Sequence, residues 1–271
     1  MSLIAPIVTL TGLGIVFGVG LALAAKKLSV QTDPRVEEIF GKLPGVNCGA
    51  CGMAGCMGFA EGLIEGKCML ERCPVTEESA RKLIAGILGI EHAVRQKTVA
   101  VLHCHGGKPR AKDKYQYRGI RECAAATLVM GGPKQCAYGC IGFGSCMRAC
   151  FFGAISMGQD DLPVVDEEKC TACGRCVASC PAGLFTLVPV QKNFAVRCKS
   201  QDFGKTVMDA CRVGCIACRK CEKACPLGAI KITDNCAIID YAVCENKGEC
   251  VKVCPTNAIA YKVNGQWRGR A

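Results

Sequence analysis

The sequence contains few aromatic residues. Phe, Trp and Tyr together make up 6% of its 271 residues. A core built around large rings is therefore not expected, and something other than apolar burial must help to organise the chain, as bound metals do in small domains. The sequence also has no P-loop, nucleophile elbow or dinucleotide fingerprint, so nothing in it indicates flavin or nicotinamide binding.

Cysteine, in contrast, is abundant, with 25 residues. Three thiols crowd one tight loop in the run Cys170-x2-Cys173-x2-Cys176-x3-Cys180-Pro181. Disulfides need specific Cα separations, an odd number of cysteines cannot all pair, and zinc ribbons separate their C-x2-C knuckles by a longer insert. The run is the signature of bacterial ferredoxins, in which the fourth cysteine binds the other cluster of a pair. The sequence therefore predicts [4Fe–4S] clusters.

A second cysteine motif lies nearer the N-terminus, in the run Cys48-x2-Cys51-x4-Cys56. Glycines within the loop allow tight backbone turns that bring N–H groups close to sulfur. A distant fourth thiolate would complete a [4Fe–4S] site. Cys73 and Cys68 both qualify, and Cys73 is preferred because a proline follows it.

Further ligand groups follow in two ferredoxin-like modules if the fourth cysteine of each run binds the other cluster of its pair. Cys136 is expected to replace the cysteine that is missing at Phe143. The expected complete ligand groups are Cys136, Cys140, Cys146 and Cys180; Cys150, Cys170, Cys173 and Cys176; and Cys215, Cys218, Cys221 and Cys254.

The last group has three clear ligands, Cys225, Cys244 and Cys250, because Lys247 stands where another cysteine would fall. Cys236 or Asp240 could supply the fourth ligand, the cluster could be [3Fe–4S], or the site could be empty. About five clusters are therefore expected. By default, the other cysteines are interpreted as small buried hydrophobic residues, namely Cys68, Cys104, Cys123, Cys198, Cys211 and Cys236.

An internal duplication relates the two modules. Cys136 to Cys150 recur 75 residues later as Cys211 to Cys225, with the same internal spacing at the shared positions. The later Cys-Pro pair recurs at an offset of 74 residues, and Cys104 and Cys198 each follow a short apolar stretch. We expect each module to alternate a cysteine loop, a short helix and a β-hairpin.

The formal net charge of +11 would by itself suggest nucleic acid or anionic lipid. Each oxidised cluster with four thiolates contributes about −2, because the ligands must lose their protons. Five such clusters nearly cancel the surplus, so no nucleic-acid partner is predicted.

Residues 1–25 carry no charged side chain, and Lys26 and Lys27 follow at once. This stretch exceeds the ~20 residues that a membrane-spanning helix needs, and the lysines place the remaining chain in the cytoplasm. A signal peptide is the alternative, but a basic leading segment is missing and clusters suit a reducing compartment. Gly14 and Gly18 indicate either close packing against a membrane partner or simply the usual small residues of such helices.

The expected fold is α+β: a transmembrane anchor (1–27), a helical [4Fe–4S] domain (28–97) and two ferredoxin-like modules (98–190 and 191–271). Helices are predicted from Asp33-Pro34 to about Phe40, over 54–65 and over 77–90, followed by a strand at 99–102. His103 and His105 are interpreted as structural rather than metal-binding. The charged stretch 108–114 is interpreted as a solvated loop rather than a docking patch.

The order of anchor, N-terminal cysteine domain and ferredoxin modules resembles the B subunit of the Rnf complex, most specifically in the segment from Gly45 to Cys56. The resemblance covers essentially the whole chain. It implies a single-pass subunit on the cytoplasmic side of the cell membrane, which takes electrons from soluble ferredoxin and relays them to other subunits. The complex is an ion-translocating ferredoxin:NAD⁺ oxidoreductase, and this subunit has no catalytic site beyond its clusters. A related complex reduces a redox-sensing transcription factor instead.

Two other classes of function compete with this interpretation. An open cluster at Lys247 could perform chemistry of its own, or the chain could be a redox sensor or scaffold. We expect outer-sphere electron transfer, with low potentials near the −400 mV typical of ferredoxins. The N-terminal cluster is expected to face the membrane partners, and a distal module the donor.

Overall fold

The computed structural model describes residues 4–28, 33–91, 94, 96–263 and 265–269. Met1 to Leu3, at the start of the predicted anchor, lie outside the described residues. The helices are α1 (Ile4–Leu28), α2 (Pro34–Phe40), α3 (Gly55–Ile64), α4 (Glu78–Leu88), α5 (Cys123–Leu128), α6 (Ser145–Arg148), α7 (Arg175–Ser179), α8 (Lys205–Ala210), α9 (Lys220–Ala224) and α10 (Glu249–Val253), with a 3-10 turn at Leu70–Arg72. The strands are β1 (Thr98–Leu102), β2 (Ile155–Met157), β3 (Pro163–Val165), β4 (Phe185–Pro189), β5 (Phe194–Val196), β6 (Ile230–Thr233), β7 (Cys236–Ile239), β8 (Ile259–Val263) and β9 (Gln266–Arg268). This is the α+β class that the sequence predicts.

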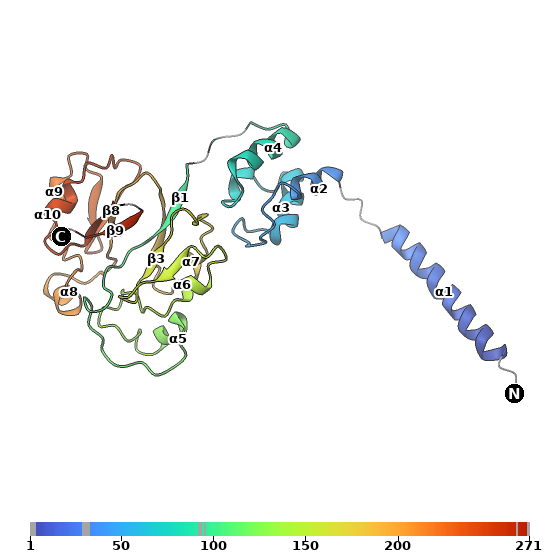
Figure 1. The fold of residues 1–271 in the computed structure, drawn as a ribbon, viewed down its shortest axis with the longest axis horizontal. Coiled ribbons are helices and arrows are strands. Elements are labelled where there is room, and N and C mark those ends of the chain that lie inside the picture. Colours follow the sequence, from blue (N-terminus) through green and yellow to red (C-terminus); the bar gives the residue numbers. More distant parts are fainter. Residues whose placement is uncertain (1–3, 29–32, 92–93, 95, 264, 270–271) are drawn as a thin grey trace.

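Helix α1 stands apart from the rest of the chain (Figure 1). Its segment Ile7–Lys27 is long and apolar enough to cross a membrane, and none of the hydrophobic window is buried against the protein. Lys26 and Lys27 occupy its last turn, where positive charge complements the helix dipole. The predicted N-terminal apolar helix is therefore present.

A small helical unit follows, built from α2, α3 and α4. Asp33 caps α2 by accepting the Arg35 backbone N–H at 2.9 Å, and Pro34 occupies the first helical position, as predicted. Helix α4 ends at Gly89 with a positive φ of 67°. The unit has its own core, whose most fully buried members are Ile39, Phe59, Leu70 and Ile84.

The first module begins with β1, which pairs antiparallel with β4 so that Val99 lies opposite Val188. Between these strands come α5, α6, the β2–β3 hairpin and α7. The strand that leads out of the helical unit, β1, thus pairs with β4, the last strand of the first module. Its residues Val99 to Leu102 are all buried.

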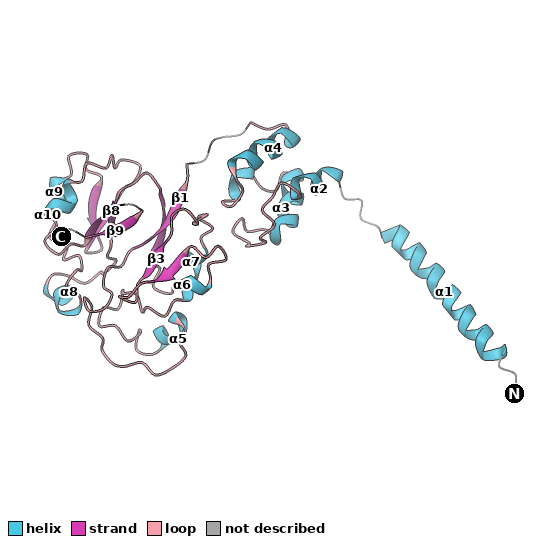
Figure 2. Ribbon diagram, viewed as in Figure 1, coloured by secondary structure: helices cyan, strands magenta, loops and turns pink. Residues whose placement is uncertain are grey.

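The second module repeats this plan: β5 pairs with β8, and β6 and β7 form the internal hairpin. Helices α9 and α10 correspond to α6 and α7, and β9 adds a third strand beside β8 (Figure 2). Each module therefore alternates cysteine loops, short helices and a hairpin, as the duplication predicts. The modules differ in one respect: 31 residues separate Cys104 from Cys136, whereas 12 separate Cys198 from Cys211. The extra segment contains α5.

The two modules pack directly against each other. Val101 and Val188 of the first module share a small buried cluster with Ala195 of the second. Lys262 on β8 forms an ion pair with Glu167 of the first module, Nζ to Oε2, at 3.1 Å, and both side chains are almost fully buried. The modules are therefore held at a fixed distance, which matters for any site that lies between them.

Candidate iron–sulfur sites

All 25 cysteines carry free thiols. At several of them the backbone N–H two residues further on points at the sulfur, as Gly142 does toward Cys140 and Ala217 toward Cys215. Such N–H groups stabilise thiolate and inorganic sulfide, and they are typical of iron–sulfur sites. Most of the cysteines gather in sets around small cavities.

The N-terminal set consists of Cys48, Cys51, Cys56 and Cys73, the last three of which belong to the helical core. The loop is shaped by Asn47, whose φ is 51° and whose Oδ1 accepts the Cys56 backbone N–H at 2.7 Å. A Cβ at Gly55 would lie 2.7 Å from that oxygen, so only glycine fits there.

The structure distinguishes between the two candidates for the fourth ligand of this set. Arg81, which is 2% exposed, donates to the Cys73 carbonyl and, at 3.0 Å, to the Thr76 carbonyl, and so fixes the Cys73 loop. The Cys68 thiol donates to the Phe59 carbonyl at 3.7 Å. A thiol that donates must keep its proton, whereas a ligand must lose it. Cys73 therefore stays the predicted fourth ligand.

In the first module, one cavity is lined by Cys150, Cys170, Cys173 and Cys176. The Ala100 N–H on β1 approaches the Cys170 sulfur at 3.5 Å. Burial raises the pKa of Cys176 to about 12, with the neighbouring thiolates of Cys170 and Cys173 acting in the same direction. The four residues are the ones that the sequence groups together.

The second cavity of the first module is lined by Cys140, Cys146, Cys180 and, unexpectedly, Cys123. Cys136, which the sequence groups with this set, lines a different cavity. Cys123 is the first residue of α5, within the extra segment, and its N–H donates to Ser145 Oγ at 2.9 Å. The insertion thus places a fourth thiol beside this set, which has Phe143 at the position where the ferredoxin spacing expects a cysteine. The spacing of the local motif does not predict this thiol.

In the second module, Cys215, Cys218 and Cys254 all lie near Cys221. Burial raises the pKa of the Cys221 thiol to about 12. This agrees with the predicted set. Cys221 lies on α9 and Cys254 follows α10 directly, so the packing of these two helices brings the set together.

The last set contains Cys225, Cys244 and Cys250, which line one cavity together with Lys247. Neither predicted substitute for a fourth ligand lies there. Asp240 is exposed and uses Oδ1 to accept the Ala242 N–H at 2.9 Å.

Cys236, the other predicted substitute, lies elsewhere. Its thiol donates to the Cys198 carbonyl at 3.3 Å. Cys236 also lies beside the sulfurs of Cys198 and Cys215, and these neighbours raise its pKa. Cys236 is not among the residues that line the cavity of Cys225, Cys244 and Cys250.

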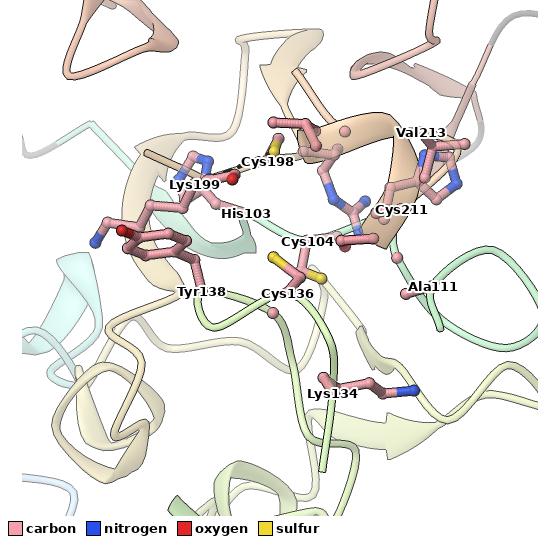
Figure 3. Close-up of a pocket in the computed structure, with 18 residues that line it drawn as sticks. His103, Cys104, Ala111, Lys134, Cys136, Tyr138, Cys198, Lys199, Cys211 and Val213 are labelled. Atoms are coloured by element: carbon pink, nitrogen blue, oxygen red, sulfur yellow. Dashed lines mark hydrogen bonds between the residues drawn. The ribbon is translucent and has the colours of Figure 1, made fainter. Parts of the chain in front are cut away.

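One further cavity, between the modules, is lined by Cys104, Cys136, Cys198 and Cys211 (Figure 3). Sequence reasoning assigns three of these cysteines no role. The signal that could have found them is the duplication, because each module supplies the same two positions.

The neighbouring histidine and charged segment have structural contacts. The His103 ring nitrogens bond to the Val196 carbonyl at 2.7 Å and to Thr186 Oγ1 at 2.6 Å. Residues 108–114 expose several side chains, but their backbone is paired: the Lys112 N–H donates to the Ala210 carbonyl at 3.0 Å. The segment is thus more than a solvated loop, because it ties the two modules together.

The donor sets suit iron–sulfur clusters. Four sulfur ligands with nearby N–H donors and apolar surroundings are what [4Fe–4S] binding requires. Zn²⁺ needs sulfurs about 2.3 Å from a single ion. Among the residues that the structure describes, no three His, Cys, Asp or Glu side chains form such a compact group.

Neighbouring sets lie close to each other along the molecule. Cys48 of the N-terminal set lies near Cys173, and Arg175 Nη1 donates to the Cys48 carbonyl at 3.3 Å. Cys176 lies near Cys146 of the next set. The sets of the helical unit and the first module thus form a continuous row.

Comparison with known families agrees with this geometry. A family described as a putative Fe-S cluster matches residues 43–75, and 4Fe-4S dicluster domains match residues 139–184 and 169–230. The fold and the cysteine sets thus define an iron–sulfur protein of the dicluster-ferredoxin class.

Three relatives match almost the whole chain. The B subunit of the Na⁺-translocating ferredoxin:NAD⁺ oxidoreductase complex of Acetobacterium woodii is 43% identical over 96% of this chain and 78% of that protein. The B subunit of the ion-translocating oxidoreductase complex of Methanosarcina acetivorans is 42% identical, over 95% and 97%. The B subunit of the proton-translocating ferredoxin:NAD⁺ oxidoreductase complex of Clostridium ljungdahlii is 37% identical, over 96% and 92%. The chain belongs to the family of B subunits of ion-translocating oxidoreductase (Rnf) complexes, as the sequence resemblance implies, and with α1 it is membrane-associated.

Proposed function

We propose that this chain is the electron-transfer subunit of a membrane-bound ferredoxin:NAD⁺ oxidoreductase that translocates ions. It accepts electrons from reduced soluble ferredoxin and passes them to the other subunits of the complex. The observation that carries this proposal is the row of cysteine sets, which runs from the helical unit next to α1 into the first ferredoxin module. Two relatives that match 96% of the chain are named as B subunits of Na⁺- and proton-translocating ferredoxin:NAD⁺ oxidoreductase complexes.

Two ligand sets lie in the helical unit and at its contact with the first module. Cys48, Cys51, Cys56 and Cys73 hold the N-terminal cluster, and Cys150, Cys170, Cys173 and Cys176 hold the next one. The remaining proposed ligands are Cys123, Cys140, Cys146 and Cys180; Cys215, Cys218, Cys221 and Cys254; and Cys225, Cys244 and Cys250. When bound, each [4Fe–4S] cluster takes up or releases one electron without making or breaking a bond to a substrate.

The protein residues hold and tune these groups. Thiolates bind the iron, backbone N–H groups face the sulfurs, and the buried positions exclude water. Overall, two reduced ferredoxins lose one electron each, and one NAD⁺ gains these two electrons and one proton on a partner subunit. This chain needs no acid or base of its own for that balance.

The arrangement relative to the membrane follows from α1. Lys26 and Lys27 at its C-terminal end favour the cytoplasmic side for everything that follows. The helical unit (28–97) then lies between the membrane and the modules (98–190 and 191–271). Labelling of exposed lysines in closed inverted vesicles, compared with right-side-out vesicles, tests this orientation: labelling of the modules only in right-side-out vesicles would contradict it.

The N-terminal cluster is proposed as the exit toward the membrane partners, with a distal module receiving electrons from ferredoxin. In a complex carrying Cys48→Ser, the distal clusters should still be reduced by ferredoxin, whereas NAD⁺ reduction should stop. Cys68→Ser is the matched control, because that thiol only donates to a backbone carbonyl. Unchanged turnover in the Cys48 variant would rule out the exit role, and unchanged turnover in a complex without this chain would refute the proposed function.

A further inference from the structure

The cavity between the two modules brings together four cysteines that no ferredoxin motif accounts for. Cys104 and Cys136 come from the first module, and Cys198 and Cys211 from the second. In the duplication these are equivalent pairs, so each repeat contributes the same two positions. A site built by both copies of a repeat in this way is symmetric by origin.

The four sulfurs share the local geometry of the other sets. At each cysteine, the backbone N–H two residues further on is directed at the sulfur: Gly106, Tyr138, Ser200 and Val213 supply these groups. The Cys140 N–H also approaches the Cys104 sulfur at 3.4 Å. Four independent segments thus aim N–H groups at sulfur around one cavity.

Close approach of the backbone also shapes the site. A Cβ at Gly106 would lie 2.9 Å from the Cys211 sulfur and 3.8 Å from the Cys104 sulfur. Glycine therefore lets the two sulfurs face the same cavity from opposite modules. The 108–114 segment helps by pairing with both sides, since Ala111 bridges Cys211 and the Gln135 N–H donates to the Lys112 carbonyl at 2.9 Å.

A buried cation lines the same cavity. Arg197 is 8% exposed and its Nη2 donates to the Cys104 carbonyl at 3.1 Å, but its buried Nε has no hydrogen-bond partner. A buried guanidinium group with an unpaired N–H is costly unless an anion lies beside it. A cluster held by four thiolates supplies such a charge, because its net charge is about −2.

We propose that Cys104, Cys136, Cys198 and Cys211 are the ligands of an additional [4Fe–4S] cluster held between the two ferredoxin modules. Four thiols lose one proton each as the iron binds. The inference deepens the proposed function, because it assumes a chain loaded with clusters.

The position of this site explains why both modules are needed on one chain. Cys140 of the first module lies near Cys104, and Cys198 lies near Cys215 of the second module. The site therefore fills the space between the Cys140 set and the Cys215 set. With it, the row of sets is continuous from Cys48 to the second module, where Cys221 lies on α9 and Cys225 directly follows it.

The test measures iron and acid-labile sulfide in the full-length chain, purified without air in detergent. The native chain should contain about 24 irons, about 23 if the three-cysteine set holds a [3Fe–4S] cluster, or about 20 if that set is empty. The variant Cys104→Ala/Cys198→Ala should lose about four irons and four sulfides while the other clusters keep their EPR signals. Cys68→Ala is the matched control and should keep the native iron content.

Unchanged iron in the double variant would overturn the inference, as would a single zinc ion that the variant loses. If the variant does not fold, the native chain decides: an iron anomalous signal amid the four sulfurs supports the site, and its absence there, with iron at the other sets, overturns it. A native chain without any iron would instead refute the proposed function itself.

Discussion

The buried ion pair between the modules offers a quantitative test of how firmly they are joined. Lys262 Nζ lies 3.1 Å from Glu167 Oε2 and also donates to the Val190 carbonyl. The two side chains are 8% and 11% exposed, so solvent screens the pair only weakly. Lys262→Met keeps most of the volume but leaves the Glu167 carboxylate buried without its cation.

The structure sets the size of the effect. Breaking a buried pair by removing one partner costs about 3–5 kcal/mol, because the remaining charge is uncompensated. At about 1.4 kcal/mol per factor of ten, the lower value corresponds to roughly 100-fold more frequent opening of the interface. Hydrogen exchange of the backbone amides in β5 and β8, followed by mass spectrometry on the cluster-loaded chain, measures this opening.

Two further variants identify the cause. Lys262→Met/Glu167→Gln removes both charges and should recover much of the protection. Lys252→Met breaks the exposed pair with Glu249, whose side chains are 70% and 46% exposed, and should change exchange little. If Lys262→Met exchanged as slowly as the native chain, or if the double variant were no better protected, the pair would not hold the modules together.

Other predictions concern individual ligand sets. Gly55→Ala should lose the N-terminal cluster, about four irons, because its Cβ would lie 2.7 Å from Asn47 Oδ1; Gly58→Ala, whose Cβ would have its nearest neighbour at 3.8 Å, should keep all iron. Cys123→Ala should also cost about four irons in chemical analysis, and retention of all iron would refute its role as a ligand. Arg197→Met should shift one cluster potential, measured by EPR-monitored titration, to more negative values by tens of mV or more, because a buried positive charge near the site is removed. Arg197→Lys should restore most of that shift, and unchanged potentials in Arg197→Met would contradict the placement of the charge.

Much of the architecture could be predicted because it depends on local sequence. The apolar N-terminal stretch, the Asp33-Pro34 helix start and the strand at 99–102 all have signals within a few residues of each other. The same holds for the regular ferredoxin runs, in which the chain turns once around each set of three thiols. The duplication then indicates that the second module repeats the plan of the first.

The cysteines that sequence reasoning did not place in a set come from separate segments. Cys123 reaches the Cys140 set from an insertion that has no counterpart in the second module, so neither spacing nor repetition indicates it. Cys136 fits the Cys140 run by sequence distance, but its backbone is drawn toward the second module by the strand pairing of residues 111–113. The site between the modules depends on how the two repeats pack, which is a tertiary property that motif spacing cannot express.

Anaerobic reaction of the purified full-length chain with reduced ferredoxin tests the central claim most directly. We predict that the chain is brown, contains about 20 to 24 irons, depending on the three-cysteine set, with matching sulfide, and bleaches as ferredoxin is oxidised, with several electrons taken up per chain. A colourless, zinc-filled or disulfide-linked chain, or one whose iron does not accept electrons from ferredoxin, would contradict it.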